Sequence, residues 1–275
     1  MAISAAMVKE LRERTGLGMM DCKRALTEAD GDMEKAIEEL RKKSALKAAK
    51  KAGRTTANGL LGIHVAADGT RGAIVEVNIE TDFAAKNEKF IAFVSKVTEK
   101  LFESADGDLA ALAAGDLNAE RETLVQEIGE NITIRRGEVV ASAAGGISEY
   151  MHGDQRRGAL VNLAEANAEL GRDIAMHVVA INPMVVRSED VAPDVLAKER
   201  EIFTSQAAES GKPEDIVVKM VEGRVKKFLA EVSLLDQPFV KDGDIKVGKL
   251  VANAGTEVLS FVRYEVGEGI EVEET

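Results

Sequence analysis

The 275-residue chain contains one cysteine, no tryptophan and four prolines, and aromatic residues make up only 4% of it. A lone Cys22 cannot form an internal disulfide, which is typical of proteins that fold in a reducing cytoplasm. No apolar run approaches the ~20 residues of a transmembrane helix. Residues 1–9 lack the basic stretch and apolar block that mark an export signal. We therefore expect a cytoplasmic protein that does not contact a membrane.

Positive charge is also scarce, since 36 Lys and Arg face 48 Asp and Glu and the net charge is −12. Nucleic-acid backbones are bound by clustered basic residues, so this balance disfavours direct nucleic-acid binding. Residues 41–54 are an exception, with seven basic residues and no acid. An RNA-binding patch is conceivable there, but no aromatic residue is interleaved for base stacking. The segment is better explained as a solvated helical linker that ends at Gly53.

No complete set of catalytic or metal-binding residues is evident. Cys22 lacks a recognisable histidine base. Residues 243–250 nearly match a phosphate-binding loop, but Leu250 replaces the hydroxyl group that would hold magnesium. The histidines show no metal-ligand spacing; they are His64, His152 and His177. These features favour a protein that is not an enzyme and needs no cofactor.

The N-terminal part, residues 1–54, shows apolar stripes at helical spacing, interrupted near Gly16 and Gly31. The pattern predicts three short helices, the third capped by Asp32, followed by the basic linker. Met19 and Met20 are adjacent and cannot both face the same core, so at least one should be exposed.

Residues 76–87 combine the end of a strand, a sharp corner and the start of a helix. Alternation of apolar and polar residues over 75–80 predicts a half-buried strand. Apolar residues then recur at helical spacing over about 83–102. Thr81 or Asp82 can cap this helix, because a short side-chain oxygen accepts the unpaired amide hydrogens of the first turn.

Phe83 falls in the first turn of the predicted helix and has two interpretations. It could fasten the helix to the sheet, or it could stand out as an apolar anchor that enters a partner. Residues 71–77 (RGAIVEV) resemble residues 157–163 (RGALVNL), an offset of 157 − 71 = 86. In that register Glu169 takes the place of Phe83, although a core position should stay apolar. The difference favours an exposed anchor.

The rest of the pattern predicts an α+β protein with a duplicated core, in which sheets carry packed helices. Residues 55–146 would form the first repeat and residues 147–187 the second. After Pro193 and Pro213, which suit helix starts, apolar residues recur every three or four positions over 218–232.

We therefore expect residues 188–237 to form an inserted antiparallel coiled coil. Residues 238–275 would return to the core, with a helix near 247–254 and a strand over 257–266, and would end in a short acidic tail.

Five segments, in order, resemble signatures of the translation elongation factor Ts family. The Thr81-Asp82-Phe83 corner resembles the core motif of that family, and residues 11–26 (LRERTGLGMMDCKRAL) look like its N-terminal signature. Three more segments are similar: 129–136 (GENITIRR), 173–178 (DIAMHV) and 220–224 (MVEGR). The resemblance spans nearly the whole chain and implies a UBA-like fold for the N-terminal helices.

By this resemblance the protein is a guanine-nucleotide exchange factor for elongation factor Tu, bound in its GDP-bound and nucleotide-free states. No covalent bond would be made or broken. The corner would displace elements around the Mg²⁺ and phosphate site of elongation factor Tu. The residues implied in this are Thr81, Asp82 and Phe83, supported by Ile128 and Gly129.

The resemblance also implies contacts on both sides of the core. The N-terminal domain would dock on the nucleotide-binding domain of elongation factor Tu through Leu11, Arg12, Met19 and Met20. His177, on the helix of the second repeat, would lie near the third domain of elongation factor Tu.

The C-terminus departs from the family pattern. Many members continue beyond residues 267–270 into a helix that touches the partner, whereas Glu271–Thr275 is a short acidic stub. One contact is therefore expected to be missing. This leaves open an alternative function, an adaptor that binds elongation factor Tu without promoting exchange, and the sequence leaves the oligomeric state open.

Overall fold

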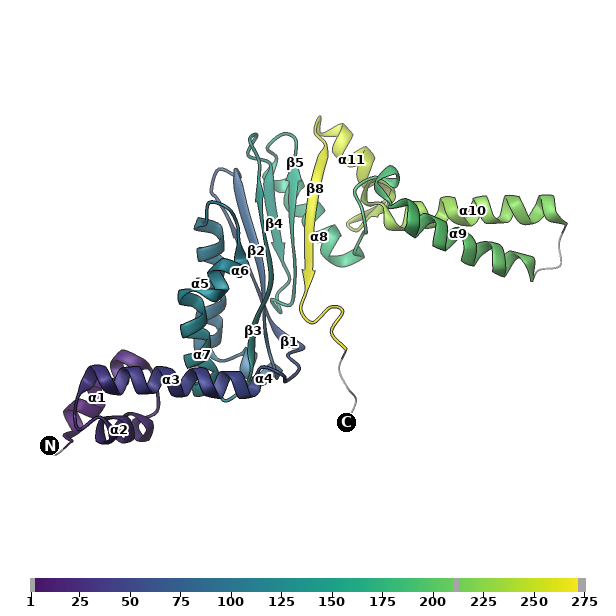
Figure 1. Cartoon of the computed structure of the whole chain (residues 1–275). Coiled ribbons are helices and arrows are strands. Elements are labelled where there is room, and N and C mark those ends of the chain that lie inside the picture. The colour runs from purple at the N-terminus through teal and green to yellow at the C-terminus, as the bar shows by residue number, and fades with distance from the viewer. Residues whose placement is uncertain (1–2, 210–212, 272–275) are drawn as a thin grey trace.

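The computed structural model describes residues 3–209 and 213–271 and shows three parts along the chain (Figure 1). An N-terminal helical bundle lies at one end, a core of sheets and helices in the middle, and a pair of helices projects from the far side of the core. Most of the acidic tail lies outside the described residues. Within the described ranges, no helix is both long and apolar enough to cross a membrane.

The N-terminal bundle is built from three helices with a small apolar core. They are α1 (Ala5–Thr15), α2 (Met19–Glu28) and α3 (Met33–Lys51). Asp32 caps α3 as predicted, because its carboxylate accepts a hydrogen bond from the Lys35 amide at 3.1 Å. The basic linker is the second half of α3 itself, so the bundle and the linker share one unbroken helix.

Two three-stranded antiparallel sheets form the centre of the core. The first has the order β1 (Asn58–Val65), β2 (Arg71–Ile79) and β3 (Ile132–Ala141). The second has the order β4 (Ile147–Met151), β5 (Arg157–Leu163) and β8 (Val258–Glu265). The chain supplies β8 only after the projecting helices, as the predicted C-terminal return to the core requires.

Helices cover the outer faces of the two sheets, and the inner faces pack on each other. The first sheet carries α5 (Glu88–Glu103), α6 (Leu109–Ala114) and α7 (Asp116–Ile128). The second carries α8 (Ala168–Ile181) and α11 (Val247–Asn253). Ile74 and Ile147 meet Leu160 and Val262 between the sheets. The core is thus a four-layer mixed α+β arrangement, with two copies of a sheet-and-helix unit back to back.

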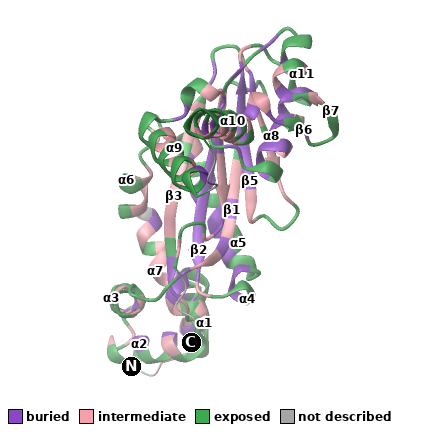
Figure 2. Ribbon diagram, turned by 90° about the vertical axis from the view of Figure 1, so that its right-hand side faces the viewer, coloured by how far each residue is buried: buried purple, intermediate pink, exposed green. Residues whose placement is uncertain are grey.

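The strand predicted to be half-buried, β2, is buried on both faces (Figure 2). The second sheet covers the face on which Glu76 and Asn78 lie, and both are fully buried. Glu76 accepts hydrogen bonds from Arg135 at 2.9 Å, Arg136 at 2.5 Å and the Gly267 amide at 2.8 Å. Burial alone would raise the pKa of this carboxyl, but these bonds outweigh burial and lower it.

The single helix predicted over 83–102 is two helices, α4 (Asp82–Ala85) and α5. Asn87 breaks the run, because its side chain caps α5 by accepting a hydrogen bond from the Lys89 amide at 2.9 Å. Asn167 caps α8 in the second unit, so the caps are offset by 167 − 87 = 80 residues rather than 86. The first unit therefore carries an extra turn, α4, and Glu169 is not the structural equivalent of Phe83.

The projecting pair consists of α9 (Pro193–Ala208) and α10 (Glu214–Val232), which pack along their length (Figure 1). Val221 and Val225 face α9, as the predicted seam requires, whereas Val218 is exposed and Val217 packs in its place. The remaining short elements are η1 (Ser188–Asp190), η2 (Leu234–Asp236), β6 (Pro238–Phe239) and β7 (Asp242–Lys246).

Candidate functional site

The corner between β2 and α4 presents Phe83 to solvent. Thr81 caps α4 as predicted, since its hydroxyl accepts a hydrogen bond from the Ala84 amide at 3.2 Å. Ala84 and Ala85 turn into the core and anchor the short helix. Phe83 points the other way and is 83% exposed. Of its two interpretations, a core contact is wrong and an exposed apolar side chain is correct.

Two charged neighbours flank the Phe83 ring. Lys86 lies 5.5 Å from the ring centroid, within the range of a cation–π contact. The same ammonium group is 3.1 Å from the Asp82 carboxylate. Asp82 is itself exposed, and this pair is held weakly because water competes with it. Asp82 is therefore available to a partner at the cost of one surface ion pair.

The carboxylate of Glu130, two residues beyond the end of α7, holds the corner in place. Glu130 accepts hydrogen bonds from both donors of Thr81, the amide at 2.9 Å and the hydroxyl at 2.8 Å. In the opposite direction, Glu80 accepts a hydrogen bond from the Asn131 amide at 2.6 Å. These three reciprocal bonds, the Glu130 clamp, hold residues 80–81 against residues 130–131. The clamp was not predicted, because only Ile128 and Gly129 were singled out in that segment.

The clamp extends to the C-terminal end of α3. The Asn131 side chain donates to the Arg54 carbonyl at 3.0 Å, and the Lys51 ammonium group donates to the Gly129 carbonyl. Arg54 also lies 3.4 Å from the Glu80 carboxylate. The helix that carries the N-terminal bundle is therefore fastened directly to the corner that carries Phe83.

Ile128 and Gly129 directly precede Glu130, and their predicted support of the Asp82 and Phe83 contact stays a prediction. Ile128 is half-buried and packs against the core of the first unit. Gly129 ends α7 with a φ of 89°, a left-handed conformation that strongly favours glycine. Its surface is open, with no atom within 4 Å of the position where a Cβ would stand.

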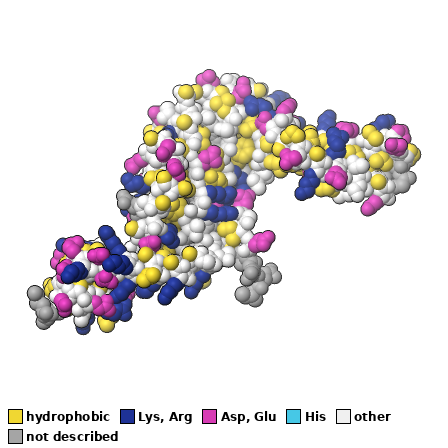
Figure 3. All heavy atoms as spheres, viewed as in Figure 1, with side chains coloured by type: hydrophobic (Ala, Val, Ile, Leu, Met, Phe, Trp, Pro, Cys, Tyr) yellow, Lys and Arg dark blue, Asp and Glu magenta, His cyan; other side chains and the backbone are white. Residues whose placement is uncertain are grey.

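The predicted N-terminal contacts divide by exposure. Met19 and Met20 are 57% and 75% exposed, so both methionines face solvent at the start of α2. Arg12 is also exposed. Leu11 is fully buried in the bundle core and has no surface to offer, so its predicted direct contact is not available in this structure. Figure 3 shows Lys and Arg side chains gathered along α3, between this bundle and the core.

His177 is fully buried, so it too cannot touch a partner directly. Its Nδ1 accepts a hydrogen bond from the Val240 amide at 3.1 Å, which leaves Nε2 to donate to Gln237 at 2.8 Å. Burial lowers the pKa of the ring, and the Gln237 bond offsets this only in part. The uncharged His177 ring therefore links α8 to residues 237–240 through two hydrogen bonds.

Chemistry elsewhere in the described ranges does not suggest a reaction centre. No group of three or more His, Cys, Asp or Glu side chains could hold a metal ion among the described residues. Cys22 is buried in the N-terminal bundle. The features that stand out are exposed apolar side chains on fixed backbone, which suit recognition of another macromolecule. The fold and the site together are typical of a protein that binds other proteins.

Comparison with known proteins identifies the family. Residues 80–268 match the family model described as "Elongation factor TS". The chain is 57% identical to Elongation factor Ts of Hahella chejuensis over 273 residues, which cover 99% of this chain and 95% of the relative. It is 54% identical to Elongation factor Ts of Saccharophagus degradans, over 98% of this chain and 93% of the relative. The chain belongs to the elongation factor Ts family.

Proposed function

We propose that this protein is a guanine-nucleotide exchange factor for elongation factor Tu, and that it makes and breaks no covalent bond. The observation that carries this proposal is the exposure of Phe83 on a helical turn that the hydrogen bonds between Thr81 and Glu130 hold in place. A large apolar side chain left in water gains ~1.5–3 kcal/mol when a partner buries it. Family membership supplies the partner and the reaction.

In the proposed mechanism, Phe83 enters elongation factor Tu beside the Mg²⁺ and phosphate site. Asp82 exchanges its weak pairing with Lys86 for a contact on the partner. Because hydrogen bonds join Thr81 to Glu130, the corner keeps its conformation when Phe83 inserts into the partner. Helices of the partner are therefore displaced instead. The partner conformation that accepts Phe83 binds GDP and Mg²⁺ poorly, and by linkage each ligand weakens the other.

Exposed residues of the N-terminal bundle supply a second contact. Met19 and Met20 offer adaptable apolar surface, and Arg12 adds a charge, for the nucleotide-binding domain of elongation factor Tu. Leu11 supports this surface from within the bundle. His177 acts in the same indirect way, by holding the second unit in shape for the far domain of the partner.

The test is release of a fluorescent GDP analogue from elongation factor Tu, with wild-type protein and with Phe83→Ala. We expect the variant to lose roughly tenfold or more in exchange rate, since a buried aromatic anchor contributes ~2 kcal/mol or more to binding. Leu259→Ala is the matched control, because Leu259 is also an exposed large apolar residue but lies on the second sheet. It should keep the wild-type rate.

Each result has a defined meaning. Equal loss in both variants would show that exposed apolar surface in general, rather than Phe83, drives exchange. Binding of elongation factor Tu by folded wild-type protein without faster GDP release would replace the exchange factor with the adaptor. Turnover of GTP by the isolated protein would contradict both functions.

A further inference from the structure

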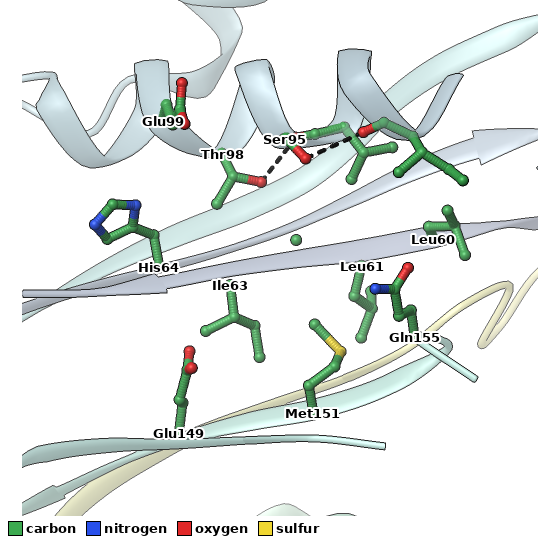
Figure 4. Close-up of a pocket in the computed structure, with 13 residues that line it drawn as sticks. Leu60, Leu61, Ile63, His64, Ser95, Thr98, Glu99, Glu149, Met151 and Gln155 are labelled. Carbon is green, nitrogen blue, oxygen red and sulfur yellow. Dashed lines mark hydrogen bonds between the residues drawn. The ribbon is translucent and has the colours of Figure 1, made fainter. Parts of the chain in front are cut away.

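A groove of about 340 Å³ runs along β1, between the two sheets and α5 (Figure 4). Its upper wall is α5, with Ser95, Thr98 and Glu99, and its lower wall is β4, with Glu149 and Met151. The groove lies between the two units and includes none of the residues assigned to the exchange function. Its floor is a sheet edge, since β1 pairs with β2 on one side only.

The backbone of β1 offers unpaired hydrogen-bonding groups to the groove. In an antiparallel pair, successive residues point their amide and carbonyl groups alternately toward and away from the partner strand. The Leu61 amide points away from β2, because it donates to the Gln155 carbonyl at 2.8 Å. Ile63 in the groove and Val65 just beyond it share that direction, and no described residue forms a hydrogen bond with their outward-facing backbone groups. This stretch can accept a further strand.

The walls of the groove are rigid and already shaped. Gly62 lets α5 lie directly on β1, since a Cβ at this position would stand 1.9 Å from the Thr98 hydroxyl oxygen. Thr98 is fixed in turn by donating to the Val94 carbonyl at 2.8 Å. His64 stacks on Phe102 with 4.2 Å between ring centroids. A ligand strand would therefore meet a preformed surface.

The groove has one acidic end and one apolar end (Figure 4). Glu99 and Glu149 stand near His64 from opposite walls, whereas Leu60 and Met151 lie toward the other end. Neither carboxylate forms a hydrogen bond or a salt bridge with any described residue. Burial raises the pKa of the Glu149 carboxyl, and nearby positive charge offsets this only in part, so the groove attracts cations most strongly at neutral pH and above. Two unpaired carboxylates beside an open strand edge complement a cationic side chain on an extended chain.

We propose that this groove binds an extended basic peptide segment of a partner protein. The segment adds to β1 as a fourth strand of the first sheet, pairing with Ile63 and Val65. Because side chains alternate along a strand, one Lys or Arg side chain points to Glu99, and the adjacent residue directs a second one to Glu149 on the opposite wall. An apolar side chain two residues away from the second cation lies against Met151. At ~3.3 Å per residue, the five residues from Leu60 to His64 match about five residues of ligand.

The experiment is NMR titration of the ¹⁵N-labelled full chain with the peptide acetyl-Val-Lys-Arg-Val-Val-amide, in which the adjacent Lys and Arg side chains point to opposite walls of the groove. We expect saturable shifts at the amides of Ile63 and Val65. The double variant Glu99→Gln/Glu149→Gln should bind roughly tenfold more weakly, because both charge partners are lost. The matched control Glu88→Gln/Glu169→Gln removes two acids outside the groove and should bind as the wild type does.

Two altered peptides complete the test. Replacing Lys and Arg by Glu should abolish the shifts, and methylating the backbone nitrogens that face β1 should abolish them too. Absence of saturable shifts at β1 in wild-type protein would overturn the proposal. So would equal binding of the acidic or methylated peptide, which would show that charge or strand pairing plays no part. GDP release is not the readout, so this outcome is independent of the exchange function.

Discussion

Phe83 and Phe90 are seven residues apart and face opposite environments. Phe90 is fully buried between α5 and the first sheet, whereas Phe83 is 83% exposed. Burial of a phenylalanine side chain contributes ~1.5–3 kcal/mol to the free energy of folding, and Phe83 makes no such contribution because it is exposed. A residue that contributes nothing to folding can be substituted without unfolding the protein, so function can be examined at position 83 independently of stability.

The Glu130 clamp leads to a prediction at the same scale. In Glu130→Gln the side-chain amide keeps one acceptor oxygen, so one of the two bonds from Thr81 is lost. A hydrogen bond to a charged group contributes ~1.5–3 kcal/mol, and we expect roughly a tenfold slower GDP release from elongation factor Tu. The thermal midpoint should fall by a few degrees, because the folded protein loses the same bond, so GDP release is measured well below both midpoints.

Glu127→Gln is the control for this variant, since Glu127 is close in sequence but pairs with Lys89 instead of Thr81. Its exchange rate should match the wild type. Unchanged exchange in Glu130→Gln, or the same loss in both variants, would remove the clamp from the mechanism.

His177 predicts how stability depends on pH. Burial lowers its pKa below the ordinary value of 6.5, so the unfolded chain binds the proton more readily than the folded chain. The stabilising effect is therefore complete above about pH 6.5 and is lost as the pH falls below it. Urea unfolding of wild type and His177→Gln at about pH 7 and about pH 5 measures this. The variant should lose less stability on acidification, and parallel losses would contradict the assignment.

Residue patterns predicted part of the site. A short polar side chain before an apolar helix indicated Thr81 or Asp82 as the cap, and the structure selects Thr81. The exposure of Phe83 was predicted correctly, but from a repeat register that does not hold at the helix, since Glu169 is not its structural equivalent. The clamp and the burial of His177 could not be predicted in this way. Thr81 and Glu130 are 49 residues apart, His177 and Gln237 are 60 apart, and neither pair lies within one periodic segment.

At the scale of elements, apolar periodicity located most helices and strands to within a few residues, because each buries one face. The prediction from apolar periodicity was wrong where the two sheets pack on each other. The alternation in β2 indicated one wet face, yet the second sheet covers that face and Arg135 neutralises Glu76 there. It also read α4 and α5 as one helix, because Phe83 and Phe90 are compatible with a single apolar stripe.

The packing of α5 on β1 predicts the effect of a single methyl group. Gly62→Ala would place a Cβ 1.9 Å from the Thr98 hydroxyl oxygen, and overpacking of this kind costs ~1–3 kcal/mol. Adding Thr98→Ala should restore part of the loss. Gly53→Ala is the control, because no atom lies within 4 Å of its added Cβ. Denaturant unfolding gives the free energies, and full stability in Gly62→Ala would show that α5 can move.

At the scale of the whole molecule, the helix pair is a separable projection. Its entry and exit lie side by side, since the Met184 amide donates to the Val232 carbonyl at 2.8 Å and the Leu234 amide to the Val185 carbonyl at 2.9 Å. The pair has a small apolar cluster of its own. Removing it therefore leaves the sheets and their helices intact.

We expect replacement of residues 193–230 by a short Gly-Ser connection to leave a folded protein. Its thermal midpoint, followed by circular dichroism, should lie within a few degrees of the wild-type value, since few contacts join the pair to the core. GDP release tested alongside would show whether exchange needs the pair. Loss of cooperative unfolding would contradict the separation.

The unbroken course of α3 has a consequence for partner choice. A helix of 19 residues is ~28 Å long. The first half of α3 packs against α2, which carries Met19 and Met20, and the C-terminal end of α3 meets the Phe83 corner. The two contact surfaces are therefore held at a set spacing and rotation before any encounter. The helix fixes the distance between the two proposed contact surfaces. A protein with both complementary surfaces at a different separation could bind only one of them at a time, so partners are selected by distance as well as by chemistry.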